Sequence, residues 1–398
     1  MEVAGVAADA PAVDSAADAY ARVRATWRRM PVLAVLERQL QSTRPLAGAR
    51  IAASGRLTKE RAHLLTVLKR AGARLLVADD PEPVAEREGL RRALGAVDYY
   101  DADQPAAKLL AAFSPHLLLD NGRLTATAVA EPALHGELRG GTLHSRNAEA
   151  LVRRALAGAA PAFPLVVLAS STLKEQIETA HGTSQSTVAA IVTATRRQLA
   201  GAIVAVLGYG ANGRGIAAHL RAAHARVLVV ERSATAGLLA VYDGMQLAPL
   251  ETALPVADIV ITATGEADVL RDGHLDLLKD GCVLANAGRR AGEIRVADLL
   301  ARADAVHDYG GGVVEHTLGS RRIVLLADGQ QVNHACGEGN ASDVMDLSLA
   351  LHVVCLRALW ERSERYSAGL VAVDPRDAEQ VAQMKLRTLG LAATGGER

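Results

Sequence analysis

A glycine-rich segment in the middle of the chain has the spacing of a dinucleotide-binding turn. The run Val206-Leu-Gly-Tyr-Gly-Ala-Asn-Gly-Arg-Gly215 places Gly208, Gly210 and Gly213 in the pattern Gly-x-Gly-x-x-Gly. In such a turn the first glycine permits a tight bend, the second lets the backbone approach a pyrophosphate, and the third allows close packing of a helix on a strand. The helix that follows would point its backbone N–H groups at the anion. We therefore predict that this segment binds a dinucleotide.

The residues around this turn favour NAD as the dinucleotide. Glu231 ends the next apolar segment, where an acid accepts hydrogen bonds from the adenosine ribose hydroxyls and repels a 2′-phosphate, although Arg232 follows it. Thr264 and Gly265 end a later apolar segment and would face the same crevice. The alternative is a glycine-rich turn that binds no ligand. The apolar strand before the turn and the helix after it argue against that alternative.

The chain on both sides of this turn alternates apolar strands with amphipathic helices. In the N-terminal part, strands are predicted over Ala49–Ala53 and Ala73–Ala78, with a helix over Glu60–Lys69 between them. A second series contains a helix that opens at Ile216 and predicted strands over Ile203–Leu207, Val227–Val230, Ile259–Thr262 and Val283–Ala285. Such alternation is typical of parallel sheets that are covered on both faces. The predicted fold is α/β with two domains.

The C-terminal part returns to the first of these domains. The periodic segment Ser342–Trp360 predicts a long helix that packs back on the N-terminal domain, which is then discontinuous. We predict an α/β substrate-binding (catalytic) domain over 19–184 and 340–398, and a Rossmann-type NAD-binding domain with a parallel sheet over 185–339. Residues 1–18 show no clear period and are predicted to be a disordered extension.

Composition excludes several classes of partner. The 44 Lys and Arg residues balance the 44 Asp and Glu residues, and only 2 Phe and 2 Trp are available for base stacking, so nucleic acid is not expected as a partner. No apolar run of about twenty residues is present, so no membrane partner is expected. Three cysteines, Cys282, Cys336 and Cys355, are too scattered for a metal cluster and are expected to be inert thiols in a reducing compartment. We predict a cytoplasmic protein without a bound metal.

Several short segments, in order and spacing, resemble the S-adenosylhomocysteine hydrolase family from about Met30 to Leu391. The matching segments are Met30-Pro31, Leu46–Ala52, Leu119–Gly122, Gly208–Gly210, Thr262–Gly265, Asn286–Gly288 and Leu325–Asn333. Enzymes of this family hold NAD tightly and use it to oxidise the 3′-hydroxyl of the substrate. That oxidation acidifies the C4′ proton and drives loss of the 5′ substituent before the final reduction. The resemblance implies a redox-neutral lyase or hydrolase that forms a homo-oligomer, a dimer or tetramer.

The resemblance also implies a central lysine–carboxylate pair. Lys174 matches the family's lysine, and Glu178 stands in place of an aspartate. Lys174, positioned by Glu178, would accept the proton of the 3′-hydroxyl and polarise the resulting ketone. The alternative is that Lys174 is an ordinary surface lysine in an exposed helical turn.

Other implied catalytic positions depart from the family pattern. Arg56 and Arg289 stand in place of histidines, Asn121 in place of an aspartate, and His144 in place of a glutamate. The arginines supply fixed positive charge but cannot shuttle protons. The amide of Asn121 has no useful basicity, so His144 or Lys174 would have to remove the C4′ proton. A histidine titrates near neutrality and suits such work, although His144 could instead be a hydrogen-bonded structural residue.

The matched motifs imply further binding residues. Thr58 and Glu60 match positions that contact the nucleoside base, where a carboxylate can accept from the amine of adenine; the alternative is an N-cap and a first-turn acid of a helix. Asn340, in place of a family histidine, is a further substrate-binding candidate. The other cofactor-binding candidates are Asn212, Asn286, Gly288, Asn333, Ser145 and Asn147.

Lys174 is retained for oxidation of the 3′-hydroxyl, whereas most of the other acid–base residues of the family are replaced. This combination predicts an NAD-dependent lyase, a dehydratase that acts on an adenine nucleoside. Transient 3′-oxidation and elimination across C4′–C5′ would give an unsaturated nucleoside, as in nucleoside-antibiotic pathways that make angustmycin-type alkenes; this comparison is an analogy. Two alternatives remain open. One is an S-adenosylhomocysteine hydrolase with a rearranged site, and the other is a non-catalytic regulator that binds NAD or a nucleoside.

Overall fold

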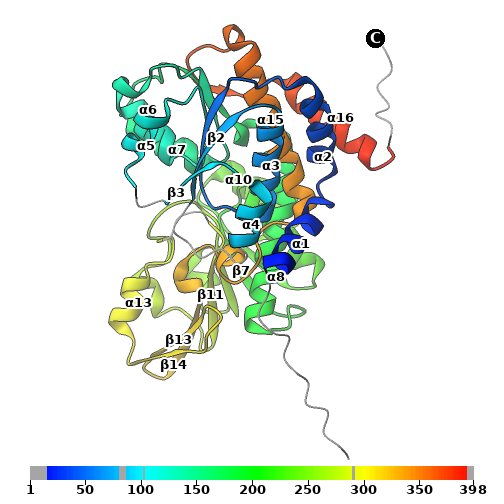
Figure 1. The fold of residues 1–398 in the computed structure, drawn as a ribbon. Coiled ribbons are helices and arrows are strands. Elements are labelled where there is room, and N and C mark those ends of the chain that lie inside the picture. Colours follow the sequence, from blue (N-terminus) through cyan, green and yellow to red (C-terminus); the bar gives the residue numbers. More distant parts are fainter. Residues whose placement is uncertain (1–15, 80–86, 102–103, 289–291, 392–398) are drawn as a thin grey trace, which may run out of the picture. The chain divides into compact units, whose positions relative to one another are not determined.

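The chain forms two compact units, and the first of them is discontinuous in sequence. A computed structural model describes residues 16–79, 87–101, 104–288 and 292–391. Unit 1 comprises the described residues up to Ser171 and from Asp346 onward, and unit 2 comprises those from Thr172 to Met345. Both units consist of a sheet with helices packed on it, so the predicted two-domain α/β fold class is confirmed (Figure 1).

Unit 1 is built on a seven-stranded sheet whose strand pairs are all parallel among the residues described. In spatial order the strands are β15 (Gly369–Ala372), β6 (Pro164–Val167), β5 (Gly140–Leu143), β4 (Leu117–Asp120), β1 (Arg50–Ser54), β2 (Arg74–Asp79) and β3 (Asp98–Asp101). The central strand β4 reads Leu-Leu-Leu-Asp, and its four residues are buried. Continuous apolar strands of this kind are expected where helices cover both faces of a sheet.

The helices of unit 1 form two groups that pack against this sheet. One group contains α5 (Ala106–Phe113), α6 (Arg123–Ala130) and α7 (Arg146–Leu156) (Figure 1). The other contains α1 (Ala16–Trp27), α2 (Pro31–Thr43), α3 (Lys59–Arg70), α4 (Arg87–Leu94) and α16 (Pro375–Thr388). The long C-terminal helix predicted from periodicity is present as α15 (Ser342–Glu361), and from Asp346 onward it belongs to unit 1. Short 3₁₀ turns lie at Pro132–Leu134, Leu168–Ser170 and Ser363–Arg365.

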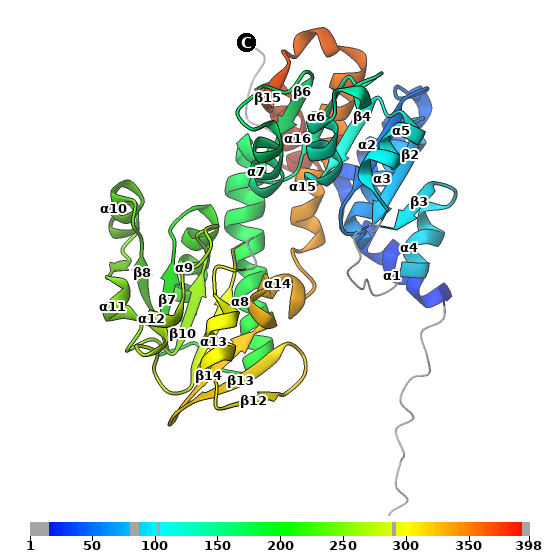
Figure 2. The same ribbon diagram turned by 90° about the vertical axis from the view of Figure 1, so that its left-hand side faces the viewer.

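Unit 2 contains an eight-stranded sheet. In spatial order its strands are β12 (Ala305–Asp308), β13 (Val313–Leu318), β14 (Arg321–Leu326), β11 (Cys282–Asn286), β10 (Ile259–Thr262), β7 (Ile203–Leu207), β8 (Arg226–Val230) and β9 (Gln246–Leu247). Its helical segments are a π-helix (Leu173–Thr183), α8 (Ser184–Thr195), α9 (Ala211–Ala222), α10 (Ala234–Tyr242), α11 (Leu250–Ala253), α12 (Asp272–Leu275), α13 (Val296–Arg302), a 3₁₀ turn (Ala327–Gly329) and α14 (Val332–Ala335). Figure 2 shows these elements from a second side.

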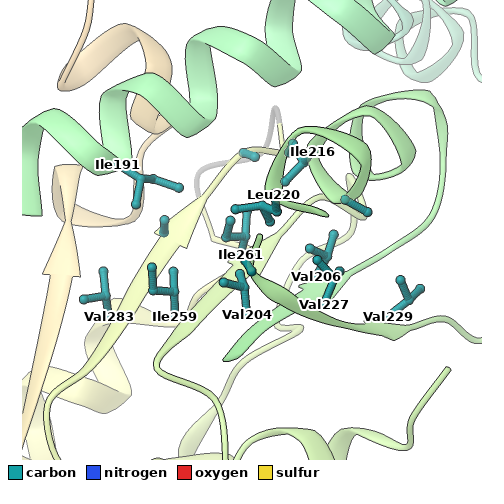
Figure 3. Packing of buried hydrophobic residues seen from close by; sticks show 14 of the residues in the cluster. Ile191, Val204, Val206, Ile216, Leu220, Val227, Val229, Ile259, Ile261 and Val283 are labelled. Atoms are coloured by element: carbon teal, nitrogen blue, oxygen red, sulfur yellow. The ribbon is translucent and has the colours of Figure 1, made fainter. Parts of the chain in front are cut away.

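The core of unit 2 lies between its central strands and helices α8 and α9. Ile216 and Leu220 of α9 pack over Val206 of β7 and Ile261 of β10 (Figure 3). Ile191 of α8 joins the same buried cluster. This packing fixes the start of α9 directly above the carboxyl end of β7, where the glycine-rich turn lies.

Two features of unit 2 differ from the sequence prediction. The helix expected to open at Ile216 begins at Ala211, so it includes Gly213 and Gly215. Glycine is needed there because the helix packs closely: a Cβ at Gly215 would overlap the carbonyl oxygen of Ala180. The sheet is also not wholly parallel, since β12, β13 and β14 are antiparallel. Gly319, with φ of 60°, opens the tight turn between β13 and β14 and permits this hairpin.

The cysteines agree with the expectation of inert thiols. Cys282 and Cys355 are buried, and burial raises the pKa of the Cys282 thiol to about 12 and that of Cys355 well above its usual value. Burial also raises the pKa of the half-buried Cys336. In the parts of the chain that the structure covers, no helix has the combined length and apolarity needed to cross a bilayer.

Candidate functional site

The glycine-rich turn of unit 2 lies at a topological switch point. Strand β7 has β8 on one side and β10 on the other, and the chain visits β8 and β9 before it crosses to β10. Ligands of open α/β sheets bind at the carboxyl ends of strands where the winding direction reverses. Gly208 follows β7, and Thr264 and Gly265 follow β10 shortly after its last residue, so the two predicted segments are brought to the same edge.

The glycines of the turn have distinct geometric roles. Gly208 has a φ of 98°, which favours glycine, and a Cβ at Gly213 would overlap the carbonyl oxygen of Gly208. A Cβ at Gly210 would meet no described atom within 4 Å, so the surface over this residue is open. Gly210 is also the N-cap of the twelve-residue helix α9. An open backbone surface beside a helix N-terminus fits a pyrophosphate.

Glu231, the predicted ribose-binding residue, holds the glycine-rich turn through backbone hydrogen bonds. Its carboxylate accepts hydrogen bonds from the backbone N–H of Tyr209 (2.7 Å) and of Ser233 (2.8 Å). A carboxylate has about four acceptor sites, so these two bonds leave capacity for the hydroxyls of a ribose. The prediction that Glu231 binds the cofactor is therefore compatible with its contacts.

A second acid, Asp243, holds the side chains of the turn. It accepts hydrogen bonds from the Tyr209 hydroxyl (3.0 Å) and pairs with Arg214 (Nε to Oδ2, 2.7 Å). Burial and the neighbouring carboxylate raise the pKa of Tyr209 to about 12. Burial opposes ionisation of Asp243, but the hydrogen bonds from Arg214 and Tyr209 outweigh it and lower the pKa of this carboxyl.

Glu293 is a site residue that the sequence did not indicate. This fully buried carboxylate accepts from the backbone N–H of Thr264 (2.9 Å), the hydroxyl of Thr264 (2.8 Å) and the backbone N–H of Gly265 (2.8 Å). It therefore fixes the loop after β10. No local motif marks Glu293. It follows the Asn286–Gly288 segment, and no known motif places an acid at that distance from it.

Asn286 and Gly288 also shape this edge. The Asn286 amide oxygen accepts from the Thr262 hydroxyl (3.1 Å) and the Gly288 N–H (2.8 Å), and its amide nitrogen donates to the carbonyl of Gly329 (2.9 Å). A Cβ at Gly288 would overlap the carboxylate of Glu293. Both residues thus position the loops at this edge, and their contact with the cofactor stays a prediction.

The remaining amides predicted in unit 2 lie around helix α8. Asn212 donates to the carbonyl of Ala287 (2.9 Å). Asn333 donates to the hydroxyl of Ser186 (3.1 Å), and its buried Oδ1 has no hydrogen-bond partner among the described residues. Asn340 accepts from Ser186 (3.1 Å) and donates to the hydroxyl of Thr183 (3.1 Å). The orphaned oxygen of Asn333 suits an amide N–H of a bound cofactor.

Lys174 and Glu178 form a buried ion pair in the π-helix at the start of unit 2. Lys174 is 3% exposed and Glu178 is 1% exposed. The alternative of an exposed helical lysine is therefore wrong. Buried charges persist where they are paired, and irregular helical turns are frequent at functional sites.

Unit 1 has its own switch point, between β1 and β4. The register pairs Ala53 with Leu119, so Gly55 and Asn121 extend from adjacent strand ends. A Cβ at Gly55 would overlap the amide nitrogen of Asn121, which shows how close they lie. Arg56 follows Gly55, and His144 follows β5, which pairs with β4 on its other side. The structure thus brings Arg56, Asn121 and His144 to one edge.

Asp120, beside Asn121, is a structural carboxylate. It is buried and accepts hydrogen bonds from the hydroxyl of Ser54 and from the backbone N–H of Thr125 (2.7 Å). Both carboxylate oxygens are therefore engaged in holding the ends of β1 and β4 and the start of α6. This leaves Asn121 as the side chain at the position where the family pattern has its second aspartate.

The predicted base-binding and cofactor residues of unit 1 lie at helix starts. Thr58 is the N-cap of α3, its hydroxyl accepts from the N–H of Arg61 (3.3 Å), and Glu60 lies in the first turn. The capping role is therefore present, and base recognition by these residues stays a prediction. Ser145 likewise caps α7, and the nearby Asn147 is exposed. Arg289 lies outside the described residues.

A fold of two α/β units, one carrying a glycine-rich turn at a Rossmann-type switch point, defines a nucleotide-binding α/β protein. Residues 179–339 match the family described as "S-adenosyl-L-homocysteine hydrolase, NAD binding domain". The adenosylhomocysteinase of Sulfurisphaera tokodaii is 33% identical over 375 residues, which cover 91% of this chain and 89% of that protein. The adenosylhomocysteinase of Pyrococcus abyssi is 32% identical, with 92% and 89% covered.

The chain therefore belongs to the S-adenosyl-L-homocysteine hydrolase family, and its cofactor is NAD. Both predictions are confirmed. Among solved structures, a dipicolinate synthase polypeptide of Bacillus halodurans has a TM-score of 0.52 at 14% identity, covering 80% of this chain and 100% of that one. At that identity the likeness concerns the fold alone.

Proposed function

We propose that the protein is a redox-neutral dehydratase that converts an adenine nucleoside into a 4′,5′-unsaturated nucleoside. Bound NAD would supply reversible hydride acceptance, through which the 3′-hydroxyl becomes a ketone and the neighbouring C4′ proton becomes acidic. Loss of that proton and of a hydroxyl from C5′ forms the double bond and releases water. The same cofactor would return the hydride to C3′, so no external oxidant would be consumed.

Lys174 is the group that we assign to the 3′-oxygen. Its buried position beside Glu178 fixes the amino group in place. A desolvated lysine in its neutral form can accept the hydroxyl proton, and the ammonium that results can donate a hydrogen bond to the ketone oxygen. Glu178 orients Lys174 through their ion pair. A surface lysine would lack both the fixed geometry and the reduced solvation.

His144 is the group that we assign to the C4′ proton. Asn121, its neighbour at the edge of the unit 1 sheet, carries an amide that cannot take a proton, and Asp120 is engaged by Ser54 and Thr125. Arg56 supplies positive charge that can stabilise an enolate. Thr58 and Glu60, at the start of α3, would recognise the adenine base.

The observation that carries this proposal is a contrast between the two units. The buried Lys174–Glu178 pair and the complete glycine-rich turn retain what 3′-oxidation requires. The edge of the unit 1 sheet instead presents Arg56 and Asn121, which cannot exchange protons. An elimination that stops before water is added back needs fewer proton transfers than a full hydrolysis, so it tolerates this change.

The test is incubation of the purified protein with adenosine in D₂O. We expect deuterium at C4′ of recovered nucleoside and a product lighter by one water, detected by NMR and mass spectrometry. Absence of exchange with adenosine and with its 5′-substituted analogues would refute the proposal. NAD released on denaturation, measured by mass spectrometry, establishes beforehand that the protein is loaded.

A second candidate is hydrolysis of S-adenosylhomocysteine. It is favoured by the 33% identity to an adenosylhomocysteinase over 91% of the chain. Release of a free thiol from S-adenosylhomocysteine, without accumulation of an unsaturated product, would support this function over the dehydratase. Ligand-dependent assembly without turnover would support the third alternative, a regulator.

A further inference from the structure

A chain of three hydrogen-bonded side chains lies within unit 1, and it includes a histidine that no sequence motif indicated. Nε2 of His352 lies 3.0 Å from Nδ1 of His144, and Nδ1 of His352 lies 2.8 Å from the hydroxyl of Thr142. The imidazole rings are nearly parallel, with an interplanar angle of 16° and centroids 5.3 Å apart. His352 is 2% exposed.

Packing does not explain a histidine at this position. His352 lies in α15 between Leu351 and Val353, both buried, where an apolar side chain would fill the space without any polar group to satisfy. A buried imidazole is disfavoured unless its nitrogens are hydrogen-bonded. Both nitrogens of His352 have such partners, and one of them is the His144 ring. The arrangement therefore points to a role that involves His144.

The hydrogen bonds of His144, His352 and Thr142 allow two arrangements of protons, and one of them leaves His144 basic. The contact between the two rings holds a single proton, on either Nδ1 of His144 or Nε2 of His352. If His352 donates its Nδ1–H to Thr142, its Nε2 is an acceptor and His144 must carry its proton on Nδ1. Nε2 of His144 is then unprotonated and basic, because the hydrogen bond made by one ring nitrogen sets the state of the other.

We propose that His352 is a positioning residue that holds His144 in this basic form and shares the proton that His144 takes up. The proposal rests on the proposed function in assigning a proton transfer to His144. When Nε2 of His144 takes the C4′ proton, the Nδ1–H of the imidazolium donates to Nε2 of His352, and that proton can cross between the rings. The pair carries one extra proton and one positive charge.

The same proton completes the dehydration. His144 returns it to the departing C5′ hydroxyl, so the C4′–H and C5′–O bonds break, the C4′–C5′ double bond forms, and water leaves. No further acid or base is required for the elimination. The pair thus offers a physical reason why Asn121 and Arg56 are compatible with turnover.

The first test is the ring state of His144 in the full-length protein. NMR of histidine labelled with ¹⁵N reports which nitrogen carries the proton, and the His144→Gln variant identifies the signal. We expect Nδ1–H with an unprotonated Nε2 in the native protein, and a shift toward Nε2–H, the usual preference of a neutral imidazole, in His352→Leu. His352→Gln should keep Nδ1–H, because its amide oxygen can accept that proton.

Kinetics provide the second readout. His352→Leu should slow C4′ exchange by at least about 10-fold with KM little changed, and His352→Gln should recover part of the loss. His135→Gln is the matched control. This half-buried histidine bonds to the carbonyl of Ala128 and takes no part in the hydrogen bonds among His144, His352 and Thr142. If His352→Leu does not fold, the comparison rests on His352→Gln. The inference then requires that His144 keeps its Nδ1–H in this variant and that C4′ exchange is slower than in the native protein.

The outcomes separate the inference from the proposed function. An unchanged His144 ring state and an unchanged exchange rate in the His352 variants would overturn the inference while the dehydratase stands. Absence of C4′ exchange in the native protein would overturn the dehydratase. In that case, a His144 ring state that still depends on His352 would support the positioning role, and one that does not would refute it.

Discussion

Lys174 illustrates how burial changes the meaning of a single residue. As a letter in the sequence it fits either a surface lysine or a cofactor-side base. In the fold it is 3% exposed and paired with Glu178, which removes the first reading. A buried ion pair is weak evidence for stability, because desolvation offsets much of the attraction. We therefore keep a functional role for this pair as a proposal.

Lys174→Met should strongly reduce turnover while NAD stays bound. Methionine has a similar length and no charge, so the size of the side chain is kept while the proton acceptor is lost. We expect a fall in turnover of at least about 100-fold, the lower range for loss of a general base. NAD content by mass spectrometry and C4′ exchange provide the measurements. Gln176→Ala, an exposed position on the same helix, is the control.

Loss of NAD from Lys174→Met would contradict this assignment, since it would indicate a structural or cofactor-binding role. Turnover equal to that of the native protein would do so more directly.

Asp243 should give the stability of the protein a defined pH dependence. Its pKa in the fold is lowered from 3.8, because hydrogen bonds from Arg214 and Tyr209 outweigh the opposing effect of burial. A lowered carboxyl pKa means that the ionised form stabilises the fold. This contribution is fully present above the unfolded value and is lost as pH falls through the lowered value in the fold.

Urea unfolding of the native protein and of Asp243→Asn should therefore show a difference in unfolding free energy that is constant near neutral pH. The difference should shrink below about pH 4, the ordinary range of an aspartate. A difference that persists undiminished to lower pH would argue that Asp243 acts through its shape and not through its charge.

Helix α9 shows why glycine spacing has meaning only within a packed element. Gly213 faces the turn, where a Cβ would overlap the carbonyl of Gly208, and Gly215 faces the π-helix, where a Cβ would overlap the carbonyl of Ala180. Gly210 has open space over it. The glycines therefore serve two purposes, close packing and ligand approach.

Substitution of these glycines should separate folding from cofactor binding. Gly213→Ala should destabilise unit 2, because the backbone of Gly208 cannot move aside without disturbing the turn. Gly210→Ala should fold with little change in stability, since no described atom obstructs its Cβ, yet should bind NAD more weakly, by about 10-fold or more, because the methyl group occupies the approach of the pyrophosphate.

Thermal unfolding of the cofactor-free protein and NAD titration by calorimetry measure the two effects independently. Equal affinity of Gly210→Ala and the native protein would contradict a pyrophosphate contact at this residue.

At the scale of the whole molecule, the two units have separate cores and separate switch points. Sheet order places the crevice of unit 1 between β1 and β4 and that of unit 2 between β7 and β10. NAD binding stabilises only the structure that it contacts, apart from coupling through shared elements. The effect of the cofactor on local stability should therefore be uneven along the chain.

Hydrogen–deuterium exchange of the cofactor-free protein, with and without added NAD, tests this expectation. Protection should concentrate in the first turn of α9 and in the loops after β8 and β10. Strands β2 and β3 of unit 1 should exchange at similar rates in both states. Protection confined to β2 and β3, with none at α9, would contradict a cofactor site at the glycine-rich turn.

Local patterns in the sequence were sufficient for the elements and for the cofactor. Strand-forming apolar runs such as Ile203–Leu207 and Ile259–Thr262 appear with those same bounds in the fold. The turn after β7 was also predictable, because the dinucleotide motif depends on residues close together in the chain. Family membership followed from the order and spacing of short segments that are each contiguous.

Only the tertiary structure decided how residues far apart in sequence act on one another. Glu293 reaches Thr264, and His352 reaches His144 across 208 positions of chain. No local pattern records such a contact, since it arises from strand order and from the return of α15 to unit 1. Burial of Lys174 likewise depends on what packs around it. Periodicity and motif spacing therefore determine elements and the cofactor, whereas the chemical state of a side chain depends on its long-range neighbours.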